Sequence, residues 1–185
     1  NPADRHLDSE VLAVHQKHPR GFELIDTYME RWFEVPEDFE GYVYTSQILQ
    51  AEGIRMAIES HRKAMPFCMG TLYWQLNDTW PVISWSGMDY YGRWKALQYF
   101  VEKTYRETIL VFEEKGDSIF VYSVTDKYQP FPAILELKFW KTDGKLMEES
   151  RKDVEVLPGS NRIWAGNKSE MARKAGGAGN AVLEA

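Results

Sequence analysis

Cysteine is almost absent from this sequence, since Cys68 is the single cysteine among 185 residues. One thiol cannot form an internal disulfide, so a disulfide scaffold and a zinc site built from cysteines are both excluded. Cys68 lies in an apolar run with no basic residue directly beside it. We therefore expect it to be a small buried hydrophobe and not a nucleophile.

Runs of basic residues are absent too. No run of Lys and Arg exceeds two residues, and 22 basic side chains stand against 28 acidic ones, which gives a net charge of -6. Binding to nucleic acid or to an anionic membrane surface needs clustered positive charge. Neither is therefore expected as a partner.

Long apolar runs are also missing. No window approaches the roughly 18 apolar residues of a membrane span, and residues 1–20 lack the apolar stretch of a signal peptide. The sequence begins at Asn1 and ends in a Gly/Ala-rich stretch at 172–185. These ends lead us to expect a piece cut from a longer protein.

The composition itself is that of a folded protein, with 44% hydrophobic and 14% aromatic residues. At roughly 100–200 residues per domain, the length allows one ordinary domain or two small ones. It falls well short of the roughly 250 residues of a complete (β/α)8 barrel.

The first 105 residues have an α/β pattern. Helical spacing of apolar residues predicts four helices, at 9–17, 22–33, 39–63 and about 93–103. Asp8 and Asp38 are the expected N-caps of the first and third helices. Residues 67–76 form an apolar run without polar alternation, which predicts a strand buried on both faces, as in a parallel sheet or barrel.

Beyond Tyr105 the period of the pattern changes to two. It predicts an antiparallel, sandwich-like module with strands at Thr108–Glu114, Asp117–Thr125, Ala133–Lys141 and Lys145–Val156. The domain boundary is expected near 104–107. Residues 166–185 follow no strand pattern, and we expect an irregular or truncated tail there.

Aromatic residues crowd the stretch from Thr71 to Trp94, around Asn77 and Asp78. They are Tyr73, Trp74, Trp80, Trp85, Tyr90, Tyr91 and Trp94. Flat apolar rings with a polar edge suit the apolar face and hydroxyl rim of a sugar, and the carboxyl end of a barrel strand is where active sites form. The alternative is that these rings fill a core or an interface.

The stretch 70–86 reads Gly-Thr-Leu-Tyr-Trp-Gln-Leu-Asn-Asp-Thr-Trp-Pro-Val-Ile-Ser-Trp-Ser, and 89–96 reads Asp-Tyr-Tyr-Gly-Arg-Trp-Lys-Ala. Together they closely resemble the end of the catalytic domain in β-mannosidases of glycoside hydrolase family 2. The helix at 42–55 and the sequence His-Gln-Lys-His-Pro at 15–19 are similar to that family as well. The resemblance covers about residues 4–105 densely.

This resemblance implies a fold. Residues 1–105 would be the C-terminal portion of a (β/α)8 TIM barrel, contributing helix 7, strand 8 and helix 8 at 38–63, 67–76 and 93–103. Residues 106–165 would be an incomplete Ig-like β-sandwich, because such a domain follows the barrel in that family. The tail at 166–185 is left unassigned.

It also implies a function: part of a retaining, exo-acting β-mannosidase that removes terminal β-D-mannose. The family's acid/base and nucleophile glutamates lie upstream of Asn1, so this chain by itself is expected to be inactive. The resemblance assigns substrate contacts to Trp74 as the subsite floor, to Asn77, Asp78 and Trp80 at the rim, and to Trp85. It implies no metal and no organic cofactor. The expected partners are a β-mannoside and the remainder of the parent barrel.

No substitute catalytic pair is found in the sequence. Glu10 and Glu170 each follow a serine but lack the aromatic residue and glycine of the family's nucleophile motif. His15 and His18 could share a metal, but without further ligands in view a solvated pair is the simpler interpretation. Arg93 and Lys95, near the start of a helix, are unfavourably placed for the helix dipole and are expected to find an acidic partner such as Asp89.

Three alternatives remain open at this stage. The chain could be a non-catalytic carbohydrate-binding module, or a structural piece whose aromatic surface docks on the rest of its parent. It could also belong to a family 2 hydrolase of another β-glycoside.

Overall fold

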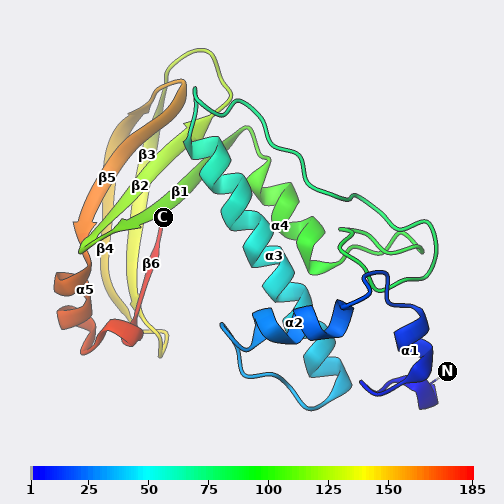
Figure 1. Cartoon of the computed structure of the whole chain (residues 1–185). Helices are drawn as coiled ribbons and strands as arrows, with labels where there is room; N and C mark the ends of the chain where they lie inside the picture. Colours follow the sequence, from blue (N-terminus) through cyan, green and yellow to red (C-terminus); the bar gives the residue numbers. More distant parts are fainter. Residues whose placement is uncertain (1) are drawn as a thin grey trace. The chain divides into compact units, whose positions relative to one another are not determined.

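The computed structural model describes residues 2–185 and shows helices followed by antiparallel sheets (Figure 1). The chain divides into two compact units. The helical unit comprises the segment up to Ile58 together with Thr71–Tyr105, and the β unit comprises Glu59–Gly70 together with Arg106–Ala185. No helix among the described residues has the length and apolar character needed to cross a membrane.

The helical unit contains the short 3-10 helix η1 (Pro2–Asp4), the helices α1 (Glu10–Val14), α2 (Gly21–Met29) and α4 (Ala96–Thr104), and α3 (Phe39–Lys63) up to Ile58. The bounds predicted for α3 are confirmed, and Asp38 caps it by accepting a hydrogen bond from the amide of Gly41 at 2.8 Å. Ser9, not Asp8, caps α1, because its side chain accepts from the amide of Leu12. Helix α2 ends at Met29, earlier than predicted.

The helical core forms between α3 and α4. Its buried members are Ala51, Ile58, Leu97 and Val101, with Ile54, Tyr73, Ala96 and Phe100 packed against them. A side chain of α3 also caps α4, since Gln47 Oε1 accepts from the amide of Ala96 at 2.9 Å. A side chain of α3 thus satisfies an amide in the first turn of α4, which has no partner within that helix.

The predicted strand at 67–76 is wrong for this structure, because no regular element forms there. Phe67 and Leu72 are 97% and 99% exposed, where burial on both faces was expected. A strand needs hydrogen-bonded neighbours at its edges, and none of the described strands pairs with this segment. Cys68, expected to be buried, is partly exposed for the same reason.

The β unit holds two three-stranded antiparallel sheets. Their strands are β1 (Thr108–Lys115), β2 (Ser118–Thr125), β3 (Phe131–Lys141), β4 (Leu146–Val156), β5 (Gly159–Asn167) and β6 (Ala181–Glu184). The sheet orders are β1-β2-β5 and β4-β3-β6. Gly116 and Gly144, at φ 59° and 88°, supply the left-handed positions that the two hairpin turns require.

One apolar cluster joins the two sheets into a sandwich. Its buried members are Val121 from β2 and Leu135 and Leu137 from β3. Leu110, Val154, Ile163, Trp164 and Leu183 pack around them from the other strands. Each sheet thus covers the apolar face of the other, which confirms the predicted antiparallel sandwich-like module.

Residues 166–185 are not irregular. Helix α5 (Lys168–Ala175) begins at Asn167, whose Oδ1 accepts from the amide of Glu170 at 2.8 Å, and it ends at Gly176 in the left-handed conformation. The short η2 (Ala178–Asn180) follows, and β6 then pairs with β3. The Gly/Ala-rich composition concealed these elements, since small residues carry little hydrophobic periodicity.

The last turn of α3 lies in the β unit, where the side chain of Arg62 contacts other residues of that unit. The Arg62 guanidinium is almost fully buried and donates to the carbonyl oxygen of Arg106 at 2.6 Å and to Asp126 Oδ2 at 2.9 Å. It also donates to the carbonyl oxygen of Glu107. This buried cation is thus both paired and hydrogen-bonded.

Candidate functional site: the aromatic loop

The aromatic loop, residues 74–94, has no regular secondary structure but a well-connected backbone. Its first and last parts lie beside the 86–88 segment through isolated bridges of Met88 with Asn77 and Trp94. The amide of Met88 donates to the carbonyl oxygen of Leu76 at 2.8 Å, and the amide of Lys95 donates to that of Gly87 at 2.9 Å. These contacts explain why α4 begins at Ala96 and not at Arg93, since the residues before Ala96 are held by the loop.

A second set of contacts joins the loop to the residues that follow α1. The amide of Ile83 donates to the carbonyl oxygen of His15 at 2.8 Å, and the amide of Lys17 donates to that of Ile83 at 3.0 Å. The His15 imidazole Nδ1 lies 2.5 Å from the carbonyl oxygen of Pro81, and its ring centroid lies 5.5 Å from that of Trp80. The tip of the loop is therefore held from outside as well as from within.

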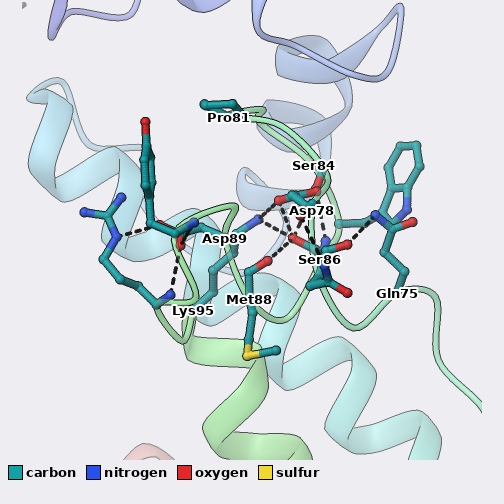
Figure 2. A network of polar contacts seen from close by, with 12 residues as sticks. Gln75, Asp78, Pro81, Ser84, Ser86, Met88, Asp89 and Lys95 are labelled. Atoms are coloured by element: carbon teal, nitrogen blue, oxygen red, sulfur yellow. Dashed lines mark hydrogen bonds and ion pairs between the residues drawn. The ribbon is translucent and has the colours of Figure 1, made fainter.

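Asp78 lies at the centre of a buried polar network (Figure 2). Ser84 Oγ donates to Asp78 Oδ1 at 2.6 Å, and Ser86 Oγ donates to Oδ2 at 2.5 Å. The Lys95 ammonium lies 3.1 Å from Oδ2 and 2.7 Å from Ser86 Oγ. The side chain of Asp78 is fully shielded from solvent and that of Lys95 is 15% exposed.

The network keeps Asp78 ionised. Burial alone acts to raise the pKa of Asp78, but the hydrogen bonds from Ser84, Ser86 and Lys95, together with the charge of Lys95, hold that pKa below its ordinary value. A carboxylate held in this way accepts hydrogen bonds and is a poor proton donor. Asp78 thus has the character of a structural anion.

Asp89, the other acid of the loop, is also held by a cation. Arg93 Nε donates to Asp89 Oδ2 at 2.6 Å, which confirms the partner expected for Arg93. Burial acts to raise the pKa of Asp89, but hydrogen bonds from Arg93 and from the amide of Tyr91, with the charge of Arg93, lower it. Neither acid of the loop is therefore poised to give a proton near neutral pH.

The five residues predicted to contact substrate occupy different environments. Trp74 is 76% exposed and Trp80 is 40% exposed, while Asn77 is exposed and donates to the carbonyl oxygen of Asp78. Asp78 is buried beneath the loop and does not line its surface. The Trp74–Gln75 peptide is cis.

Trp85 lines a cavity to which neither Trp74 nor Trp80 contributes. Its carbonyl oxygen accepts from Gln50 Nε2 at 2.7 Å, and the Lys17 ammonium lies 5.2 Å from the ring centroid. Its indole Nε1 is buried without a hydrogen-bond partner among the described residues. This cavity is mainly apolar, measures about 650 Å³ and lies between α1, α2, α3 and residues 82–85.

The remaining aromatic residues of the stretch are divided between core and surface. Tyr73 packs on the helical core and donates to Gln98 Oε1 at 3.1 Å, and burial raises its pKa. Tyr90 and Tyr91 pack edge to face on the surface, and Trp94 packs in the same way against Tyr99 of α4. The interpretation of core filler therefore holds for Tyr73 but not for Trp74.

Ser84, Ser86 and the contact of His15 to Trp80 were not predicted from the sequence. An acidic partner was expected for Lys95, but that partner is Asp78 and not Asp89. Serines separated by one residue are a weak signal, and only folding brings Lys95 beside Asp78. The placement of Lys95 near the start of α4 is unfavourable for the helix dipole, and this was the available signal for a buried anionic partner.

The structure gives no support to a metal site at the two histidines. No group of three or more metal-ligating side chains occurs among residues 2–185. His15 contacts the loop, whereas His18 Nδ1 accepts from the amide of Arg20 at 3.1 Å. Cys68 Sγ donates to the carbonyl oxygen of Gly70.

No family model matches the chain. It is 37% identical to β-mannosidase B of Aspergillus oryzae over 141 residues, which cover 74% of this chain and 16% of that protein. It is 32% identical to β-mannosidase of Capra hircus over 129 residues, covering 62% of this chain and 15% of the relative.

Among solved structures, the β-D-mannosidase of Dictyoglomus thermophilum matches with a TM-score of 0.84 at 30% identity, over 90% of this chain and 21% of that chain. The exo-chitosanase of Amycolatopsis orientalis matches with a TM-score of 0.67 at 16% identity, which shows a shared fold alone. The chain thus spans about a fifth or less of the length of these relatives.

Proposed function

We propose that this chain, which belongs to the β-mannosidase family, supplies the aromatic wall of a sugar subsite. The chain would be a C-terminal fragment of a retaining, exo-acting β-mannosidase of glycoside hydrolase family 2. The parent would hydrolyse terminal β-D-mannose residues. The carrying observation is that Trp74 and Trp80 stand exposed on a loop whose base is braced by Asp78 and Lys95. Exposed aromatic rings offer the flat apolar faces that a sugar-binding platform requires.

The same proposal assigns the parts of the chain to domains. Residues 1–105 would be the closing portion of the parent's (β/α)8 barrel, with α3 as helix 7, residues 67–76 as strand 8 and α4 as helix 8. Residues 106–165 would be an incomplete Ig-like sandwich, to which β6 adds a further paired strand. The exposed apolar side chains of Phe67, Leu72 and Trp74 support this, because a strand taken out of a barrel presents such side chains without neighbours.

Within the subsite, the proposed roles differ with the environment of each residue. Trp74 forms the floor against the apolar face of the sugar, and Asn77 and Trp80 form the rim. Asp78 shapes the rim from beneath, since its side chain is buried. Trp85 acts at the back of the wall, facing the cavity that it lines with α2 and α3.

The chemistry would come from the part of the parent that precedes this chain. Retaining hydrolysis uses two carboxyl groups about 5–5.5 Å apart, one as nucleophile and one as acid/base. The two acids of the aromatic loop are each paired with a cation and are engaged by hydrogen bonds. The fragment alone is therefore expected to be inactive, and the proposed reaction requires no metal or organic cofactor.

The other candidate functions make distinct predictions. A free-standing carbohydrate-binding module would bind sugar with this chain alone, and a family 2 hydrolase of another β-glycoside would retain the wall but prefer another sugar. The exposed apolar side chains of the segment 67–76 favour the barrel fragment over the free-standing module.

The test is hydrolysis of chromogenic β-mannoside by the chain alone and after mixing with a separately expressed preceding portion of its parent. We expect no turnover alone and restored turnover on mixing. Parallel assays with chromogenic β-glucoside and β-galactoside check the sugar preference. Turnover by the purified chain alone would contradict the proposed absence of catalytic acids.

A further inference from the structure

We propose that Asp78 and Lys95 are positioning residues: their buried ion pair sets the place of Trp80 in the sugar subsite, and neither side chain touches the sugar. This inference rests on the proposed function, because it concerns how the same wall is held. It departs from the expectation that Asp78 contacts substrate directly.

The geometry of the loop base carries the first step. Asp78 and Ser84 are the two ends of the segment that bears Trp80, and their side chains are joined by the 2.6 Å hydrogen bond to Oδ1. Ser86 and Lys95 hold the other oxygen, Oδ2, of the same carboxylate. One carboxylate therefore closes the segment 79–83 at its base (Figure 2).

The other contacts of this segment come from the residues that follow α1. The segment has no regular secondary structure, and its path away from the base is held by the contacts of His15 with Pro81 and Trp80 and by the backbone bonds of Ile83. Without closure at the base, these outer contacts would anchor one side of the segment alone. The Trp80 ring would then sample other positions.

The opposite charges of Asp78 and Lys95 are the third feature that supports the positioning role. Asp78 Oδ1 and Oδ2 accept from three donors, and an amide at this position would present a donor nitrogen to at least one of them. Removing the Lys95 ammonium would instead leave a buried carboxylate without its cation. Either substitution disturbs the base of the loop, but neither replaces an aromatic residue of the wall.

The experiment uses the complete β-mannosidase that contains this chain, with the variants Asp78→Asn, Lys95→Met, the double variant and Ser84→Ala. Steady-state kcat and KM are measured for a chromogenic β-mannoside. Mannose binding is measured in parallel, with tryptophan fluorescence as the signal. We expect KM to rise about tenfold in Asp78→Asn and Lys95→Met with kcat changed far less, because uniform binding is what a misplaced wall loses. The double variant should be no worse than either single one.

Two controls separate this effect from general loss of stability and from failure of the proposed function. Asp126→Asn removes the negative charge that pairs with the buried Arg62 in the β unit and should leave KM unchanged. Trp80→Ala removes the wall itself and should raise KM at least as much as Asp78→Asn. An unchanged KM in both Trp80→Ala and Trp74→Ala would overturn the proposed wall.

A raised KM in Trp80→Ala with an unchanged KM in folded Asp78→Asn would overturn the positioning role alone. If Asp78→Asn and Lys95→Met do not fold, Ser84→Ala decides, because it removes one hydrogen bond from the carboxylate and keeps the ion pair. A KM equal to that of the parent in Ser84→Ala would then contradict the inference, and a rise of about threefold would support it.

Discussion

The imidazole of His15 packs on the indole of Trp80, with their ring centroids 5.5 Å apart, and its Nδ1 lies 2.5 Å from the carbonyl oxygen of Pro81. The residues after α1 and the aromatic loop are therefore one structural element, although 65 positions separate His15 from Trp80 in the sequence. A change at His15 should be felt at the exposed wall.

We predict that His15→Ala loosens the tip of the loop and destabilises the protein by about 1 kcal/mol, the usual net value of one hydrogen bond with its contacts. Acrylamide quenching of tryptophan fluorescence in the complete protein should increase. The matched control is His18→Ala, since the His18 imidazole accepts from the amide of Arg20 instead. Equal quenching in the two variants would show that His15 does not hold Trp80.

Lys95 and Arg93 should contribute differently to the free energy of unfolding. Lys95→Met leaves the buried Asp78 carboxylate unpaired and should cost about 3–5 kcal/mol in the free energy of unfolding. Arg93→Met breaks a pair whose arginine is 74% exposed, so its loss should cost about 1 kcal/mol or less. Urea unfolding of the two variants measures this difference, and similar losses would mean that burial does not govern the pair.

The low pKa of Asp78 predicts an acid-dependent contribution to stability. The folded-state pKa lies below the ordinary value of 3.8, so the contribution is complete above that value and is lost as the pH falls through the lower folded-state pKa. The difference in unfolding free energy between the parent and Asp78→Asn should therefore be constant from pH 7 to about pH 5 and shrink below about pH 4. Urea titrations at pH 7, 5, 4 and 3 test this, and a constant difference across the series would contradict it.

Substitutions in the exposed segment 67–76 should affect stability less in the isolated chain than in the complete protein. Leu72→Ser should change the stability of the isolated chain by about 0.5 kcal/mol or less, because Leu72 is 99% exposed, and it should reduce self-association. In the complete protein the same change should cost about 2 kcal/mol or more, since the side chain would be buried there. Analytical ultracentrifugation and urea unfolding measure the two effects.

A matched control for this pair of experiments is Tyr128→Ser. Tyr128 is also strongly exposed but lies in the β unit, outside the proposed barrel segment. Its substitution should be nearly neutral in both settings. If Leu72→Ser is neutral in the complete protein as well, residues 67–76 are not a buried strand of the parent.

The helix at Phe39–Lys63 and the hairpins of the β unit could be predicted from the sequence because their signals are local. Asp38 marks the start of α3, apolar spacing marks its buried face, and Gly116 and Gly144 mark the turns. Such signals are present in the residues of the element itself, so they do not depend on distant partners.

The failures share a physical cause. The apolar run at 67–76 indicates burial but not the partner that would provide it, and this chain contains no neighbouring strand for it among the described residues. The pairing of Asp78 with Lys95 is likewise a tertiary fact that spacing does not encode. The substrate roles of Trp74, Asn77, Trp80 and Trp85 stay predictions, since they depend on a sugar and on the rest of the parent.

In the complete parent protein, we expect residues 67–76 to form a barrel strand beneath the sugar-binding wall. Hydrogen exchange of their backbone amides, followed by mass spectrometry in the chain alone and in its complex with the preceding portion of the parent, tests this expectation most directly. We expect rapid exchange across 67–76 in the isolated chain and strong protection in a complex that hydrolyses β-mannoside. Unchanged rapid exchange in an active complex would contradict it.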